Sequence, residues 1–259
     1  MNLALPTEGL AEYKSLSQRA RISSESWGTQ NLYCVHCDSD RLDQLPSNTP
    51  ARDYRCPQCD TAFQLKCSAK PYGRRLLDGA YSKMRDAILH GDTPHFFLMS
   101  YAPESMKVEN LLCIPNFVLT ESALEKRKPL APTARRAGWV GCNILLDRIP
   151  IDARISIVKG NRATPPAEVR RTYSRLKPLA DLKLEKRGWT LDVLSAARSL
   201  GKTEFDLPEI YAFENSLKKL HPDNHHIQPK IRQQLQVLRD LGLLEFLGDG
   251  SYRLLTKQD

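Results

Sequence analysis

The sequence predicts an α/β (α+β) fold in two domains, on the basis of three patterns along the chain. In the first part, short runs rich in Val, Ile and Phe follow amphipathic stretches. Two Cys-x2-Cys pairs lie near the N-terminus. From about Trp189 onward, apolar residues recur every three or four positions, and two strand-like runs follow. We therefore expect an N-terminal domain over 1–182 and a C-terminal domain over 183–259.

The N-terminal domain is expected to contain helices, strands and one cysteine-bearing segment. Apolar β-branched runs bounded by turn residues are typical of strands. Amphipathic runs that begin at a polar residue such as Thr7 are typical of helices with an N-cap. Helices and strands mixed in this order indicate an α/β or α+β arrangement. The predicted helices span 6–22, 74–90 and 165–178, and the predicted strands span 95–102, 110–119 and 154–160.

The C-terminal domain has the pattern of a winged helix. Amphipathic helices are predicted over 190–200, 207–220 and 228–241. The apolar runs on either side of Gly248-Asp249-Gly250 predict a hairpin. Three helices followed by a hairpin are the elements of a winged helix, which is related to the helix-turn-helix.

The composition indicates a globular protein with an anionic partner. The chain has 259 residues, of which 41% are hydrophobic and 26% charged. The sequence lacks an apolar run of ~18 residues and a secretory signal pattern, so we expect a cytoplasmic location and no membrane partner. The net charge is +8, and the positive charge is concentrated between Lys126 and Lys177. This concentration favours a nucleic-acid backbone, and the alternative is a solvated basic face.

The two Cys-x2-Cys pairs predict a four-cysteine zinc site. Eighteen residues separate the pairs, a spacing typical of such sites, and a reducing compartment disfavours disulfides. A closed set of four thiolates leaves no position for water, so the zinc is expected to be structural. The predicted ligands are Cys34, Cys37, Cys56 and Cys59, while Cys67, Cys113 and Cys142 are expected to be buried apolar residues and His36, His90 and His95 are not expected to be ligands.

The segment after the second pair, Asp60 to Lys66, has the alternation of a strand. Gln64 and Lys66 would point to one face, and the cysteine turn would bring Asp53 to the same place. Asp53, the Gln64 side-chain oxygen and the Leu65 carbonyl could then hold Mg²⁺, with Mn²⁺ as the alternative. The cation would activate a water for phosphodiester hydrolysis while Lys66 stabilises the developing charge. The alternative is a surface strand with outward-facing polar residues.

The chain resembles the DpnI family of methyl-directed restriction endonucleases. The resemblance rests on YKSLSQRARI, on the two cysteine pairs, on KPLAPTARRAGWVGCNI (128–144), on RGWTLDVL and on HIQPKIRQQLQVLRDLGLLEF. It implies a PD-(D/E)xK core with a structural zinc knuckle, a C-terminal winged helix, and Mg²⁺-dependent cleavage of double-stranded DNA at adenine-methylated GATC. It also implies that Asp53 and Lys66 are catalytic, that Trp139 lies beside the methylated adenine, and that the protein is a monomer.

Position 64 departs from the family, which has Glu where this chain has Gln64. A neutral amide offers a ligand oxygen without a charge, so metal affinity should fall or metal preference change. We keep Gln64 in the expected catalytic set, since Gln also occurs there in active relatives of the wider superfamily. Glu12, on the expected first helix, is a further candidate acid, and its alternative is an exposed surface carboxylate.

Two segments are expected to read DNA. Trp139 offers a flat apolar wall for the adenine methyl group, and Arg135 and Arg136 could meet phosphates or a guanine edge; the alternative for Trp139 is a core position. In the C-terminal domain, 228–241 is the expected recognition helix, with an inward stripe of Ile231, Leu235, Leu238 and Leu241. The candidate DNA contacts of this second reader are His226, Lys230, Arg232, Gln233 and Gln234, each of which could instead be solvated.

The sequence therefore predicts a type II methyl-directed restriction endonuclease with Asp53, Gln64 and Lys66 as its hydrolytic centre. The alternative is a methyl-DNA-binding protein whose catalysis is weakened by Gln64. A third interpretation, a zinc-ribbon transcription factor, accounts for the cysteines and the winged helix. It leaves the Asp53–Lys66 arrangement and the large middle region unexplained.

Overall fold

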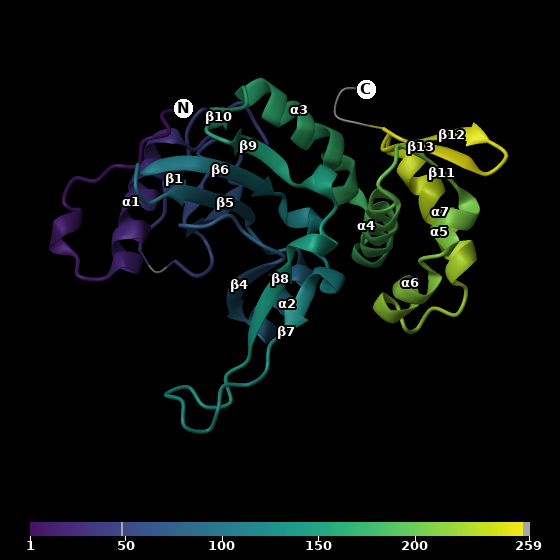
Figure 1. Ribbon diagram of the computed structural model, residues 1–259, viewed down its shortest axis with the longest axis horizontal. Coiled ribbons are helices and arrows are strands. Elements are labelled where there is room, and N and C mark those ends of the chain that lie inside the picture. The colour runs from purple at the N-terminus through teal and green to yellow at the C-terminus, as the bar shows by residue number, and fades with distance from the viewer. Residues whose placement is uncertain (48, 256–259) are drawn as a thin grey trace. The chain divides into compact units, whose positions relative to one another are not determined.

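The structure is a computed structural model that describes residues 1–47 and 49–255 (Figure 1). The chain forms two compact units that alternate along the sequence. Unit 1 comprises Met1–Gly73, Gly91–Asn116 and Arg154–Ser174, and unit 2 comprises Arg74–His90, Phe117–Ala153 and Arg175–Asp259. The expected α/β (α+β) class is confirmed, whereas the expected domain boundary at 182/183 stays a prediction.

Unit 1 is built on a seven-stranded sheet. The continuous apolar run HFFLMSYA forms β5, which is buried along nearly its whole length because both of its faces are covered. β3 runs parallel to β5, and every other neighbouring pair in the sheet is antiparallel. In sheet order the strands are β1 (Asp43–Gln44), β2 (Tyr54–Arg55), β3 (Ala62–Ser68), β5 (His95–Ala102), β6 (Lys107–Ile114), β9 (Ile155–Lys159) and β10 (Arg162–Ala163).

Two helices accompany this sheet (Figure 1). α1 (Leu16–Asn31) packs against β3, and α3 (Pro166–Leu176) is the predicted basic helix. The expected helix over 6–22 is wrong in both bounds. Gly9 is left-handed with φ 70° and Tyr13 is extended, so only the short 3-10 helix η1 (Leu10–Glu12) forms before α1. Ser15, and not Thr7, occupies the N-cap position of α1.

The first part of unit 2 holds a small antiparallel sheet with the order β4-β8-β7. The expected helix over 74–90 is half wrong, because Arg75–Ala80 forms β4 and pairs with β8, and only Tyr81–His90 forms a helix, α2. The long loop 127–140 connects β7 to β8 and extends from the sheet (Figure 1). The other elements here are β7 (Leu124–Lys126), β8 (Gly141–Leu145), η2 (Asn116–Val118), η3 (Glu121–Ala123), η4 (Leu146–Arg148) and η5 (Ile151–Ala153).

The second part of unit 2 is the winged helix that the sequence predicts. Its hairpin turns around Gly248-Asp249-Gly250, as expected. The expected helix over 207–220 is broken into two short helices at Ala212 and Phe213, and the strand β11 completes a sheet of order β11-β13-β12. The elements are η6 (Lys177–Asp181), α4 (Leu184–Ser199), β11 (Glu204–Asp206), α5 (Leu207–Tyr211), α6 (Glu214–Leu220), α7 (Ile227–Asp240), β12 (Leu244–Gly248) and β13 (Ser251–Leu254).

Among the residues that the structure describes, no helix combines the length and the apolar character needed to cross a bilayer.

Within unit 2, buried and half-buried polar groups of the winged helix bond to the segment that precedes it. Arg198 of α4 forms two bonds of 2.7 Å with the Asp152 carboxylate. The carboxylate of the buried Asp192 accepts a hydrogen bond from the Ser122 hydroxyl at 2.9 Å, and its other oxygen lies 2.9 Å from His221 Nε2.

Candidate functional site

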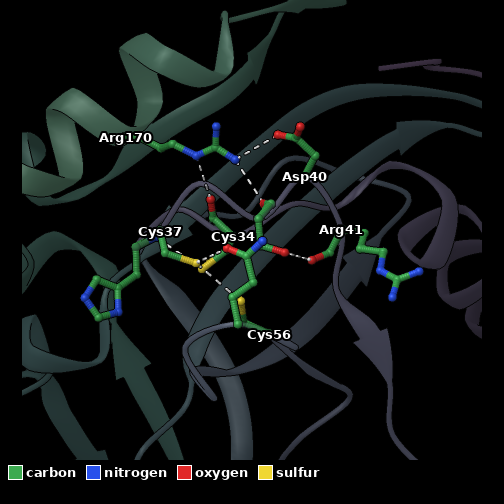
Figure 2. Close-up of polar contacts among 9 residues, drawn as sticks. Cys34, Cys37, Asp40, Arg41, Cys56 and Arg170 are labelled. Atoms are coloured by element: carbon green, nitrogen blue, oxygen red, sulfur yellow. Dashed lines mark hydrogen bonds and ion pairs between the residues drawn. The ribbon is translucent and has the colours of Figure 1, made fainter.

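The four cysteines of the two Cys-x2-Cys pairs converge in unit 1. Their sulfur atoms all lie within 4.8 Å of one another, with Sγ–Sγ distances of 3.6 Å between Cys34 and Cys59 and 3.5 Å between Cys37 and Cys56. A tetrahedron of thiolates at about 2.3 Å from zinc has sulfur–sulfur distances of about 3.8 Å. The cluster therefore fits a zinc ion with a closed ligand set, which is the arrangement of a structural site. Figure 2 shows three of its members, Cys34, Cys37 and Cys56.

Tight turns bring each pair of cysteines together. In the first turn, the Cys34 amide donates to the Ser39 carbonyl at 3.0 Å, and the His36 amide points at the Cys34 sulfur at 3.4 Å. In the second turn, the Asp60 amide donates to the Cys56 carbonyl at 3.0 Å. The second turn leads directly into β3, so the position of the cysteines and the position of this strand are coupled.

The histidines near the cluster have other partners. His36 Nδ1 lies 3.1 Å from Thr61 Oγ1, and that hydroxyl lies 3.1 Å from Cys59 Sγ. His95 is buried; its Nδ1 accepts the Asn116 amide at 3.0 Å and its Nε2 lies 3.0 Å from the Tyr173 hydroxyl. Burial lowers the pKa of His95 to about 3, so its ring is neutral and Nε2 carries the proton.

Asp53 lies beside the predicted active strand, as the sequence suggests. Its backbone amide donates to the Phe63 carbonyl at 2.9 Å, and its Oδ2 accepts the Leu65 amide at 2.7 Å. Gln64 and Lys66 follow on the same strand and are both half-buried. The structure therefore brings Asp53, Leu65 and the 64–66 segment together at one place on β3.

The charge environment of Asp53 includes three other ionisable side chains. Burial raises the pKa of the Asp53 carboxyl above its usual range, and the charge of Glu25 raises it further. The hydrogen bond from the Leu65 amide and the positive charges of Lys66 and Arg21 act in the opposite direction. These interactions link Asp53 to β3, which carries Lys66, and to α1, which carries Arg21 and Glu25.

Glu25 is a residue that the sequence reasoning missed. It lies on α1, its carboxylate accepts Arg21 Nε at 2.6 Å, and it lines the same pocket as Asp53. The expected first helix ends at residue 22, so Glu12 is the candidate active-site acid that the sequence predicts on it. In the structure Glu12 lies on η1 and is exposed. The large apolar residues of α1 (Leu16, Ile22 and Trp27) are too widely spaced to predict that the helix continues past residue 22 to Asn31. The other residues that line this pocket are Arg21, Gln44, Leu45, Pro46, Ser47 and Arg52.

In unit 2, Trp139 of the loop 127–140 lies between Arg136 of the same loop and Gly141 of β8. The Arg136 guanidinium lies over the Trp139 ring at 4.5 Å from the centroid. The Trp139 ring also lies against Gly141, because a Cβ added to this glycine would be only 2.7 Å from a ring atom. Trp139 is half-buried and Arg135 is exposed. Trp139 and Arg136 thus form one cation–π pair, and the DNA-reading role of Trp139 stays a prediction.

The expected recognition helix, α7, has its predicted contact residues on two faces. Ile231, Leu235 and Leu238 are completely buried, as expected for the inward stripe, whereas the fourth expected member, Leu241, is half-buried at the C-cap. The prediction that Gln234 contacts DNA is wrong. Its side chain is 0% exposed, and its Oε1 accepts a hydrogen bond from the Thr190 hydroxyl at 2.8 Å. A side chain held in the core in this way cannot meet DNA. The remaining candidates lie outside the core, with His226, Arg232 and Gln233 exposed and Lys230 half-buried.

An α/β fold with four cysteines that could hold zinc and a C-terminal winged helix defines the broad class of proteins that carry a helix-turn-helix-type domain. Two family models narrow this class. The model DpnI, the Dam-replacing family, matches residues 1–182, and the model DpnI_C, the Dam-replacing HTH domain, matches residues 185–254. The chain belongs to the DpnI, or Dam-replacing, family. Membership supports a methyl-directed nuclease that acts on DNA and a winged helix that binds it.

Proposed function

We propose that this protein is a type II methyl-directed restriction endonuclease that hydrolyses double-stranded DNA at adenine-methylated GATC sites with Mg²⁺. The observation that carries the proposal is the hydrogen bond from the Leu65 amide to Asp53 Oδ2. This bond aligns an aspartate with the strand that carries Gln64 and Lys66, in a chain whose family supports a nuclease.

The residues at this place fit a hard divalent cation. With Oδ2 held by the Leu65 amide, Asp53 Oδ1 is the oxygen that would meet the ion. The Gln64 amide oxygen and the Leu65 carbonyl would complete the protein's share of an oxygen ligand set. A bound cation supplies Lewis-acid polarisation of the phosphate and a more acidic water. Lys66, whose charge acts on Asp53, would stabilise the negative charge that develops on the phosphate.

Glu25 extends this proposal to α1. Its charge already acts on Asp53, and the two side chains line one pocket. A second carboxylate near the cation would offset the charge that Gln64 lacks relative to Glu. We propose Glu25, in place of Glu12, as the acid that supports the metal site from the first helix.

Recognition is proposed to involve two separate surfaces of unit 2. Trp139, stacked on Arg136, offers its ring to the methyl group, and Arg135 would contact the backbone. On α7, Lys230, Arg232 and Gln233 are proposed as the second reader, together with His226 at the start of the helix. The structural role of zinc, the 182/183 domain boundary, the cytoplasmic location and the monomeric state stay predictions.

The test uses one plasmid prepared with and without adenine methylation at GATC. Each form is incubated with the purified protein and Mg²⁺, and separately with Mn²⁺, and the products are resolved on a gel. Cutting of the methylated plasmid alone is the expected result. Cutting of both forms would overturn the methyl dependence.

The alternative function is a methyl-DNA-binding protein, and the observation that favours it is the neutral side chain at Gln64 on the candidate strand. It predicts selective retention of methylated DNA in a shift assay with no cleavage by either ion. The variant Gln64→Glu separates the two functions. Gain of cleavage by this variant alone would mean that the amide has disabled the natural chain.

A further inference from the structure

Arg170 of α3 forms hydrogen bonds with the first cysteine turn. Its Nε donates to the Cys34 carbonyl at 3.1 Å, and its Nη2 donates to the Ser39 carbonyl at 2.9 Å and to Asp40 Oδ1 at 3.1 Å. Figure 2 shows the guanidinium reaching from the helix to the turn that carries Cys34 and Cys37. A side chain more than a hundred positions away in the sequence therefore contacts the backbone of Cys34 and of Ser39, which follows Cys37 by two residues.

The side chain is held in this position by more than its polar bonds. The guanidinium lies over the Tyr33 ring at 5.3 Å from the centroid. The Arg170 side chain is 19% exposed, whereas the Asp40 side chain is 89% exposed. The ion pair with Asp40 is therefore weakened by solvent. The two backbone carbonyls are the important acceptors, because the planar guanidinium group can donate to both at once.

The two cysteine turns differ in what supports them. The second turn, Cys56 to Cys59, is framed by β2 before it and β3 after it. The first turn lies in the stretch 32–42, which has no helix or strand of its own. Its internal support is the Cys34–Ser39 backbone bond and the Ser39 hydroxyl bond to the Arg41 carbonyl. Arg170 therefore supplies to the first turn the fixed backbone that strands supply to the second.

We propose that Arg170 is a positioning residue of the zinc centre, which presets the Cys34–Cys37 turn for the metal. Fixing the turn before the ion arrives lowers the ordering cost of binding and slows the release of the ion. Zinc affinity commonly falls ~10- to 100-fold when a residue that orients the ligands is removed. This inference rests on the proposed zinc site and is independent of DNA cleavage.

The experiment compares the full-length wild type with three variants. Arg170→Ala removes the guanidinium group, and Arg170→Lys keeps a positive charge that can reach one carbonyl. Arg171→Ala is the control on the same helix, since Arg171 is exposed. Metal content is measured first. Zinc release to a colorimetric chelator is then followed, and the thiolate charge-transfer and d–d bands are recorded after cobalt(II) replacement.

The expected result is zinc release ~10- to 100-fold faster for Arg170→Ala than for Arg171→Ala. Arg170→Lys should fall between them, and the cobalt bands of Arg170→Ala should shift, which a general loss of stability would not cause. If Arg170→Ala does not fold, the comparison of Arg170→Lys with Arg171→Ala decides. Equal release rates and unchanged cobalt spectra would overturn the proposal. A wild type that binds neither metal would overturn the zinc site itself, whatever the DNA assay shows.

Discussion

The segment around β3 and the loop 127–140 differ in how their functional side chains are held. Asp53, just before β2, is fixed by bonds to the backbone of Phe63 and Leu65 on β3 of the seven-stranded sheet. The loop that carries Trp139 is closed by bonds within itself, such as that from the Leu130 amide to the Trp139 carbonyl at 2.9 Å. Arg135 and Arg136 of this loop are exposed, whereas Arg127 at its start is half-buried.

This difference follows from what each segment is proposed to do. Hydrolysis requires that the ligand oxygens and the lysine be in place before the phosphate arrives, because any reorganisation adds to the barrier. A reading loop completes its contacts only when DNA is bound, so its charged side chains can stay solvated until then. The comparison can be tested by disturbing each segment separately.

The largest effect is expected from removing the cysteine centre. Cys34→Ser takes away a buried ligand, and folding free energy in small zinc sites is largely metal-binding free energy, about 10–16 kcal/mol. We expect loss of bound zinc and cooperative unfolding of unit 1, measured by metal analysis and thermal melting. Cys67→Ser, which changes a cysteine outside the cluster, should retain zinc. Retention of zinc by Cys34→Ser would contradict the four-cysteine site.

A large effect on cleavage alone is expected from Asp53→Asn. The amide oxygen can still accept the Leu65 amide, so β3 should keep its place, but the negative charge that would meet the cation is lost. Loss of such charge stabilisation costs ~10²- to 10³-fold in rate. Cleavage of methylated plasmid should fall by at least this much. Retention of methylated DNA in a shift assay should be unchanged, and a parallel loss of both would show that Asp53 is not specific to hydrolysis.

The sequence predicts the cysteine site and β3 but not the contributions of Glu25 and Arg170. The cysteine spacing predicts the metal site, and the alternation around Gln64 predicts β3, because both depend on neighbours in the chain. Glu25 was missed because helix α1 begins after the left-handed Gly9 and the extended Tyr13, and continues to Asn31. Arg170 was beyond reach, since its contacts with the first cysteine turn depend on how α3 packs.

The recognition helix shows the same limit within one element. The apolar spacing predicts that Ile231 and Leu235 are buried, and they are. Gln234 lies next to this stripe, so its position on the helix does not decide between core and surface. The deciding factor is Thr190 on α4, whose hydroxyl pairs with the amide and makes burial of a polar side chain acceptable.

A moderate effect on methyl discrimination is expected from Gly141→Ala. The new Cβ would lie 2.7 and 2.8 Å from Trp139 ring atoms, so the ring must shift. A disturbed base contact costs about 1 kcal/mol or more, and the preference for methylated over unmethylated DNA should fall accordingly in competition binding. Gly79→Ala on β4 is the matched control, because an added Cβ there meets nothing within 4 Å.

The same variants allow a readout without DNA. Of the three tryptophans, Trp27 and Trp189 are each 1% exposed and Trp139 is half-buried, so acrylamide quenching reports mainly on Trp139. Gly141→Ala should change the quenching constant and Gly79→Ala should not. A changed quenching constant with intact methyl preference would mean that Trp139 moves but does not sense the methyl group.

The smallest effect, a shift in pH dependence, is expected from Glu25→Gln. The pKa of Asp53 is raised by burial and by the charge of Glu25. Protons compete with the cation for this carboxylate, so the metal-dependent rate at low Mg²⁺ should fall as the pH drops through the raised pKa. Removing the Glu25 charge lowers that pKa, and the acid limb of the rate profile should move to lower pH.

A direct role of Glu25 at the cation would appear in a separate parameter. In that case Glu25→Gln would also raise the Mg²⁺ concentration needed for half-maximal cleavage, as expected for the loss of a carboxylate near a hard cation. Glu12→Gln is the control, since Glu12 is exposed on η1 and should change neither the acid limb nor the Mg²⁺ requirement. An acid limb that stays in place or moves to higher pH in Glu25→Gln would show that Glu25 does not act on Asp53. Glu25 would then be only the partner of Arg21 on α1.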